Sequence, residues 1–277
     1  MNQKIYLHVG LPKTGTTFLQ KKVFPKLNFI NSVHNERLLF NMIYQDSVDY
    51  QEEEFEGEEG ILSLEGLTGI QPVHEYIDRG KVADRLWSKF PDAKILIVVR
   101  NQFDMMRSLY SHCVRVGCTV PFRKFVLYNN GFHETRDPKL FGYTYITYIP
   151  PQVLDYTNLL KYYEKFDLTV LQFEELQKNP ELFIKKVCDW AEEDTITIDM
   201  TKENESTGNV SITRFLNRFV RSRYNNAPLF PWLDSRKVYN KFKCALPEDK
   251  EVEAATREYY SESNRILNDR FNLSLAV

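Results

Sequence analysis

A short loop near the start of the chain has the residues needed to bind an anion. Gly10 and Gly15 are separated by four residues, and Lys13 lies between them. Thr16 and Thr17 follow, and the apolar spacing predicts a helix that begins near Phe18 and Leu19. The first backbone N–H groups of a helix have no intrahelical partner and carry partial positive charge, so they stabilise an anion. The loop is therefore predicted to bind phosphate, with Lys13 as its cation and the two threonines as hydroxyl donors.

The loop differs from the one with which nucleotide kinases hold ATP. In that loop a lysine follows the second glycine, and here Thr16 occupies the position. A kinase also needs a carboxylate for Mg²⁺, typically at the end of a neighbouring strand. The best candidate strand, residues 94–99, is followed instead by Arg100, whose planar guanidinium suits a phosphate. A nucleotide or small-molecule kinase is thus the alternative enzyme, and a metal requirement would identify it.

Three segments resemble, in order, the sulfotransferases that use 3′-phosphoadenosine 5′-phosphosulfate (PAPS). Residues 12–17 look like the 5′-phosphosulfate loop of that family, and residues 94–112 look like its 3′-phosphate segment. Residues 168–191 are similar to the strand and helix that follow in the family. One departure is Gln102, at a position where the family often has proline. Three motifs in the family's order make the resemblance far more specific than one glycine loop would.

The resemblance implies a role for each matching residue. The 5′-phosphosulfate would be bound by the loop residues Pro12, Lys13, Thr14, Gly15, Thr16 and Thr17, and the 3′-phosphate by Arg100 and Ser108. Lys13 would also stabilise the charge that builds on the bridging oxygen as the nucleotide leaves. Sulfuryl transfer needs no metal under this interpretation, and PAP is the product.

The general base is expected to be Glu65, which ends a predicted strand over residues 61–65. Members of the family that use a carboxylate, such as the heparan sulfate sulfotransferases, have a glutamate in a comparable place. Cytosolic members use a histidine, so His74 and His133 are the rival candidates. We expect His8 and His112 to be packing residues instead.

Alternating strands and helices predict the fold. Strands are expected near residues 5–9, 61–65, 94–99 and 168–173, and helices over 36–44, 81–90, 103–116, 153–166, 212–224 and 247–271. This order is typical of an α/β three-layer sandwich with a central parallel sheet and a P-loop-like strand–loop–helix. Residues 118–151 lack periodicity and are predicted to be a functional loop or lid. The 43% of hydrophobic residues suffice for one large core, and we expect a single domain over residues 1–277.

Charge and cysteine usage restrict the partners and the compartment. The net charge of −2 gives no case for nucleic acid binding. Residues 46–65 carry nine acidic side chains and residues 202–243 carry nine basic ones, the latter including Arg214, Arg218 and Arg221 on one face of a predicted helix. The four cysteines form no C-x-x-C pair, which argues against a disulfide framework or a zinc site. With no signal segment and no run of about 18 apolar residues, we expect a cytoplasmic protein without a membrane span.

The sequence therefore predicts a PAPS-dependent sulfotransferase acting on a small-molecule or oligosaccharide acceptor, with a carbohydrate hydroxyl as the leading class. From a different class of protein, a non-catalytic binder of adenosine bisphosphate is the second alternative. Binding without turnover would identify it.

Overall fold

The computed structural model describes residues 4–28, 31–33, 59–65, 67–68, 79–115, 117–128, 131–132, 149–198, 210–220 and 246–277. The chain divides into two compact units. Unit 1 comprises Met1–Arg100, Tyr156–Glu203 and Ser263–Leu275; unit 2 comprises Asn101–Asp155, Asn204–Glu262 and Ala276–Val277. The expectation of a single domain over residues 1–277 stays a prediction.

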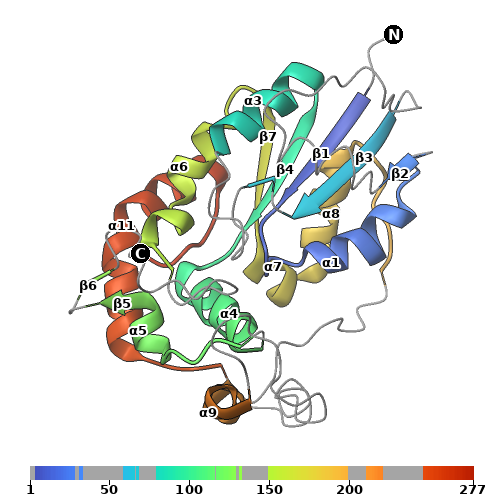
Figure 1. Ribbon diagram of the computed structural model, residues 1–277. Coiled ribbons are helices and arrows are strands. Elements are labelled where there is room, and N and C mark those ends of the chain that lie inside the picture. Colours follow the sequence, from blue (N-terminus) through green and yellow to red (C-terminus); the bar gives the residue numbers. More distant parts are fainter. Residues whose placement is uncertain are drawn as a thin grey trace. The chain divides into compact units, whose positions relative to one another are not determined.

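Unit 1 is built on a sheet of five parallel strands in the order β2-β3-β1-β4-β7 (Figure 1). The strands are β1 (Lys4–Gly10), β2 (Asn31–Val33), β3 (Glu59–Glu65), β4 (Lys94–Val99) and β7 (Asp167–Gln172). In register, Gly10 lies opposite Glu65 and Val99 lies opposite Gln172. Neighbouring strands therefore end together at one edge of the sheet, where ligands bind in folds of this type.

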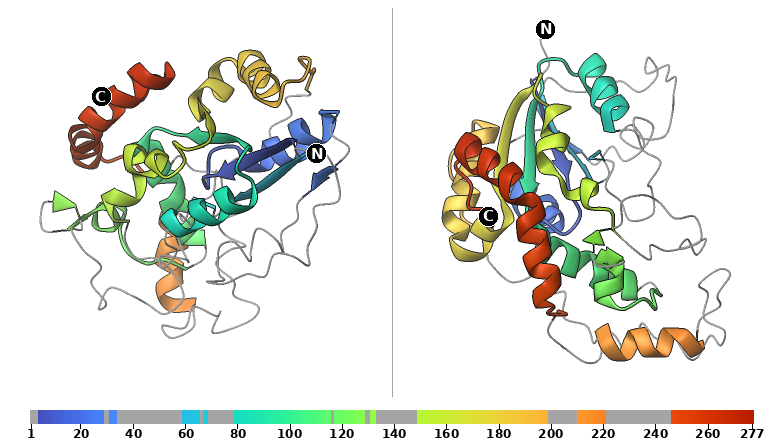
Figure 2. Two further views of the ribbon diagram at one scale, coloured as in Figure 1. Left: turned by 90° about the horizontal axis from the view of Figure 1, so that it is seen from above. Right: turned by 90° about the vertical axis from the view of Figure 1, so that its left-hand side faces the viewer.

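Helices cover both faces of this sheet, as Figure 2 shows. One face carries α8 (Pro180–Ala191) and the helical run after β1, which is α1 (Thr16–Phe18), a π-helical turn (Leu19–Val23) and a 3₁₀ turn (Phe24–Lys26). The other face carries α3 (Arg79–Lys89) and α6 (Tyr156–Lys161). The predicted three-layer α/β arrangement around a parallel sheet is confirmed.

The strands are apolar on both faces because both faces are covered. On one side Tyr6, Leu96 and Val98 pack in a buried cluster with Phe183 and Val187 of α8. The alternate strand residues Leu7, Val9, Ile95, Ile97 and Val99 are fully buried on the opposite side. Each such side chain contributes about 1.5 to 3 kcal/mol on burial, so this double core holds the strand ends in place.

An acidic clamp lies at the other ends of the strands. Glu192 follows α8 in the left-handed conformation (φ 57°) and forms ion pairs with Lys4 of β1 and Lys94 of β4. Its carboxylate also accepts a hydrogen bond from the Tyr6 hydroxyl at 3.3 Å. The hydrogen bonds and charges of the two lysines lower the pKa of Glu192 to about 2.

We expect this clamp to give the protein a pH-dependent part of its stability. A carboxylate whose pKa is lowered by folding stabilises the native state above its ordinary pKa of 4.5, and that contribution disappears as the pH falls towards about 2. Glu192→Gln should therefore lower Tm at pH 7, and the difference from wild type should shrink to zero between pH 4.5 and 2. Thermal unfolding of both proteins across this range measures it, with Glu258→Gln as control. A difference that is equal at pH 7 and pH 2 would show that charge is not the cause.

Unit 2 is mainly helical. It contains α4 (Gln102–Arg115), α5 (Phe122–Val126), a hairpin of β5 (Leu127–Tyr128) and β6 (Gly131–Phe132), a 3₁₀ turn (Pro151–Leu154) and α9 (Val210–Val220). The long helix α11 (Lys250–Phe271) contributes its first part, up to Glu262. In α9 the exposed side chains include Phe215 and Phe219, whose rings contact each other, while Asn217 is buried and donates to the carbonyls of Val114 and Cys118.

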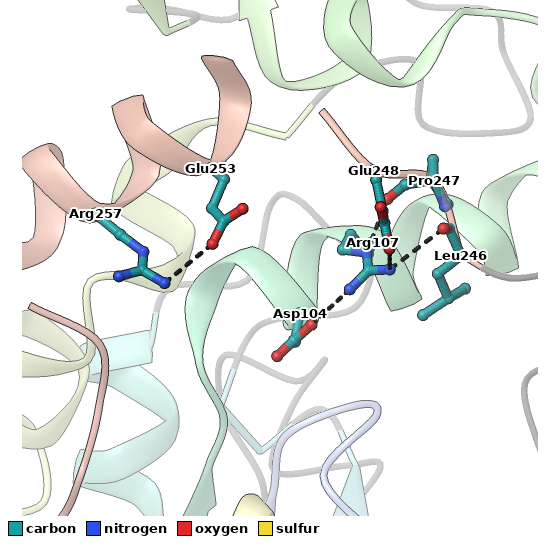
Figure 3. A network of polar contacts seen from close by, with 7 residues as sticks. All are labelled: Asp104, Arg107, Leu246, Pro247, Glu248, Glu253 and Arg257. Carbon is teal, nitrogen blue, oxygen red and sulfur yellow. Dashed lines mark hydrogen bonds and ion pairs between the residues drawn. The ribbon is translucent and has the colours of Figure 1, made fainter. Parts of the chain in front are cut away.

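Arg107 ties α4 to the segment that leads into α11 (Figure 3). Its guanidinium donates to the carbonyls of Pro247 at 2.8 Å and Leu246 at 3.2 Å, and to the Asp104 carboxylate at 3.0 Å. Asp249 then accepts hydrogen bonds from the Glu251 and Val252 amides, which caps α11. The position of α4 is thus fixed by residues that lie about 140 positions later in the chain.

Two expectations about local structure were wrong. The predicted helix over residues 153–166 is divided, because Asp155 is extended (ψ 94°) between the 3₁₀ turn Pro151–Leu154 and α6. The predicted loop over residues 118–151 contains α5 and the β5–β6 hairpin in its described part. The predicted helix over 36–44, residues 46–58 of the acidic segment, His74, His133, Arg221 and Cys244 lie outside the described residues.

Candidate functional site

The loop between β1 and α1 is held in a conformation with two left-handed residues. Lys13 has φ 65° and Gly15 has φ 85°. A lysine with positive φ costs about 1 to 3 kcal/mol unless its surroundings enforce it. Gly10 leaves little room for a side chain, because a Cβ there would lie 3.3 Å from the Leu64 carbonyl oxygen and from the Thr16 hydroxyl. The chain thus turns tightly and presents Lys13 at the end of the sheet.

The loop threonines stabilise this turn from inside. The hydroxyls of Thr14 and Thr16 both donate to the Leu11 carbonyl, at 2.7 and 3.1 Å. The helix begins at Thr16, slightly earlier than expected, and the Leu19 amide donates to the Gly15 carbonyl at 3.0 Å. Binding of an anion by this loop, with Pro12 and Thr17 included, stays a prediction.

Glu65 lies beside this loop, as the sequence predicted. It ends β3 directly opposite Gly10, and both the Lys13 charge and the Thr16 hydroxyl act on its carboxylate. Burial raises the pKa of Glu65 above its ordinary value, while Lys13 and Thr16 partly offset this effect. The Thr16 hydroxyl therefore both donates to the Leu11 carbonyl and helps to stabilise the Glu65 carboxylate. The structure therefore brings a cation and a carboxylate with a raised pKa together, as acid–base chemistry requires.

A buried polar group supports β3 just before Glu65. The Ser63 hydroxyl forms hydrogen bonds with His8 Nδ1 at 2.7 Å and with Gln20 Nε2 at 3.0 Å. His8 is fully buried and packs edge-on against Phe24, so the expectation that it is a packing residue is confirmed. Sequence reasoning missed Ser63 and Gln20, because Ser63 meets His8 through the register between β1 and β3 and meets Gln20 only where the π-helical turn Leu19–Val23 packs against the sheet.

Arg100 follows β4 and reaches the same loop. Its Nη1 donates to the Lys13 carbonyl at 3.0 Å, and its guanidinium lies over the Phe173 ring, 4.7 Å from the centroid. The buried Tyr156 hydroxyl donates to the Arg100 carbonyl at 2.8 Å. A hydrogen bond from a charged group contributes roughly 1.5 to 3 kcal/mol, which is enough to offset the strain at Lys13. This contact was not anticipated, since Arg100 was assigned only to the 3′-phosphate.

Ser108 is buried in α4 and belongs to unit 2, so its pairing with Arg100 on one phosphate stays a prediction. Gln102, where the resembling family often has proline, is the first residue of α4. Proline is favoured at that position because its missing N–H is not needed there, and the helix begins at the same point with glutamine.

Among the residues that the structure describes, no group of three or more His, Cys, Asp or Glu side chains is arranged to hold a metal ion. Nor does that part of the chain include a helix long and apolar enough to cross a membrane.

Comparisons with known proteins show the family and the fold of the chain. A family model described as "Sulfotransferase domain" matches residues 5–230. A sulfotransferase from Alicyclobacillus acidocaldarius is 17% identical with a TM-score of 0.57, covering 99% of this chain and 98% of that chain, which shows a shared fold. No curated protein sequence matches the chain.

Two other solved structures are more distant. A sulfotransferase domain from the curacin biosynthetic pathway is 13% identical (TM-score 0.39; 94% of this chain, 98% of that one). Mouse sulfotransferase SULT7A1 complexed with PAP is also 13% identical, with a TM-score of 0.35, and the match covers 98% of this chain and 90% of that chain. Both TM-scores are too low to show a shared fold. The family model, however, spans most of the sequence and includes Lys13, Glu65 and Arg100. The chain therefore belongs to the sulfotransferase domain family.

Proposed function

We propose that the protein transfers a sulfuryl group from PAPS to an acceptor hydroxyl, giving PAP and a sulfated product. The observation that carries the proposal is the juxtaposition of Glu65, at the end of β3, with Lys13, in the tight loop that follows β1 and contains two left-handed residues. A cation for the leaving nucleotide and a base for the acceptor are the two groups that this reaction needs.

The reaction follows from these positions. Glu65 takes the proton of the acceptor hydroxyl while the acceptor oxygen forms a bond to sulfur. The bond between sulfur and the bridging phosphate oxygen breaks, and its electron pair leaves with PAP. Lys13 stabilises the charge that develops on that oxygen, as cations do in phosphoryl transfer. The chain contributes by positioning the donor, the acceptor and the base relative to one another.

The 3′-phosphate of PAPS is assigned to Arg100 and Ser108 on the basis of the family resemblance. A carbohydrate is the leading acceptor class, because the position of Glu65 at a strand end resembles that of the carboxylate base in the heparan sulfate sulfotransferases. A small molecule or an oligosaccharide would both supply such a hydroxyl. His74 and His133 are the alternative bases.

Binding of PAP tests the donor assignment directly. We expect saturating PAP to raise Tm, because a ligand at about 100 times its Kd stabilises the native state by about 2.7 kcal/mol. For a chain of this size that corresponds to a shift of roughly 5 to 10 °C. Differential scanning fluorimetry with PAP, with the analogue lacking the 3′-phosphate, and with ATP plus Mg²⁺ separates the possibilities.

The expected order is PAP first, then the analogue, with ATP and Mg²⁺ last. Stronger stabilisation by ATP with Mg²⁺ would contradict the proposal and favour a kinase. Binding of PAP without any release of PAP from PAPS, over a panel of sugars, phenols and amines, would instead identify a non-catalytic adenosine bisphosphate binder.

A further inference from the structure

We propose that Phe173 is a positioning residue of the sulfuryl-transfer site, which acts by holding the Arg100 guanidinium against the backbone of Lys13. The inference rests on the function proposed above and adds a residue that lies outside the loop. Phe173 begins α7 (Phe173–Lys178), immediately after β7.

The register of the sheet brings the two side chains together. Val99 lies opposite Gln172 where β4 pairs with β7, so the residues that follow, Arg100 and Phe173, leave the sheet side by side. The guanidinium then lies over the aromatic face, 4.7 Å from its centroid, and Nη1 donates to the Lys13 carbonyl at 3.0 Å. A cation over an aromatic face is attracted by the ring, so the ring favours this orientation of the guanidinium.

The same ring also borders the loop on a second side. A Cβ built on Gly15 would lie 3.2 Å from Phe173 Cε2 and 3.1 Å from Leu176 Cδ2. Phe173 is itself partly buried against the core cluster that contains Leu171. The ring is thus supported by the core and contacts both Arg100 and the place where the loop turns.

The consequence concerns the backbone of Lys13, because residues other than glycine rarely adopt a positive φ. Its carbonyl is fixed by the Arg100 hydrogen bond, and that bond depends on where the guanidinium lies. Without the ring, Arg100 can turn away and the Lys13 backbone can relax. Both catalytic charges would still be present, but the ammonium would no longer point at the leaving oxygen.

The test compares two replacements of Phe173. Phe173→Leu keeps an apolar side chain against Gly15 and removes the aromatic face, whereas Phe173→Tyr keeps the face. We expect Phe173→Leu to lower kcat for PAP release from PAPS by about 10- to 100-fold, because small displacements of a catalytic group have effects of this size. Phe173→Tyr should stay within about twofold of wild type, as expected for an intact aromatic face. If Phe173→Leu does not fold, Phe173→Met provides the same comparison.

A double-mutant cycle with Lys13→Ala separates positioning from a merely structural role. If Phe173 acts through Lys13, Phe173→Leu has no further effect on kcat once Lys13 is alanine. Trp87→Leu is the matched control, because Lys165 lies over the Trp87 ring at 5.7 Å in a part of unit 1 away from the loop. We expect that control to leave kcat unchanged in both backgrounds.

Unchanged kcat in Phe173→Leu, or a loss that multiplies fully with that of Lys13→Ala, would overturn the inference. If the proposed function itself were wrong, the wild-type protein would neither bind PAP nor release it from PAPS, and this result separates the two kinds of failure. Wild-type binding and turnover together with an inactive Phe173→Tyr would refute the role of the aromatic face alone.

Discussion

Replacing Glu65 with glutamine is expected to lower kcat by about 10² to 10⁴, because that is the contribution of a positioned general base. Glutamine keeps the shape of the side chain and can still form a hydrogen bond with Thr16, but it cannot take a proton. PAP affinity should change little, since the nucleotide contacts assigned to the loop and Arg100 are retained. Steady-state kinetics with PAPS, together with PAP titrations, measure the two quantities separately.

The pH dependence provides an independent check on Glu65. A base must be ionised to work, so the rate should rise with pH through the pKa of Glu65. Burial raises that pKa above the ordinary 4.5, and the acid limb of the profile should therefore lie above that of an ordinary carboxyl. The limb should vanish in Glu65→Gln.

Glu65→Gln should not lower the stability of the protein, although it lowers activity. Because burial penalises the charged form of Glu65, Glu65→Gln should leave Tm at neutral pH unchanged or higher. An active Glu65→Gln, with His74→Ala or His133→Ala inactive, would transfer the role of base to a histidine.

Lys13→Ala is expected to reduce kcat by about 10² to 10³, the typical cost of losing one preorganised partner of the transition-state charge. Folding should be affected far less, because the Arg100 hydrogen bond is made to the Lys13 backbone and survives the substitution. The measurement is kcat for PAP release, with the exposed Lys21→Ala as control.

Lys13→Gly makes the test sharper. Glycine adopts positive φ without strain, so this variant should be at least as stable as wild type while being equally inactive. A Lys13→Ala or Lys13→Gly protein that retains turnover within a few-fold of wild type would exclude Lys13 from catalysis.

The strands whose ends carry the candidate site were predicted correctly from local sequence pattern. A strand that ends at Gly10 and another that ends at Glu65 can be read from alternation and glycine placement, and parallel strands of one sheet end at a common edge. The strand before Arg100 is a continuous apolar run, as expected for a strand buried on both faces.

What local pattern could not reveal is contact across the sheet. Arg100 meets the Lys13 carbonyl and the Phe173 ring only because of the registers of three strands, and no spacing in the sequence encodes those registers. The division at Asp155 was missed for a different reason. Apolar spacing continues across it, but an extended residue after the 3₁₀ turn Pro151–Leu154 interrupts the helix.

Unit 2 is assembled from segments that the ribosome makes far apart in time. Arg107 donates hydrogen bonds to the carbonyls of Leu246 and Pro247, and Arg123 donates to the Asp249 carboxylate. The Asn101 side chain accepts a hydrogen bond from the amide of Ala276. A nascent chain that has reached residue 200 therefore has α4 without the segment that anchors it, and the apolar side chains of that helix lack part of their cover. Loop closure over such distances is slow, and exposed apolar surface favours aggregation in the meantime. We expect unit 2 to complete its folding only after translation of α11.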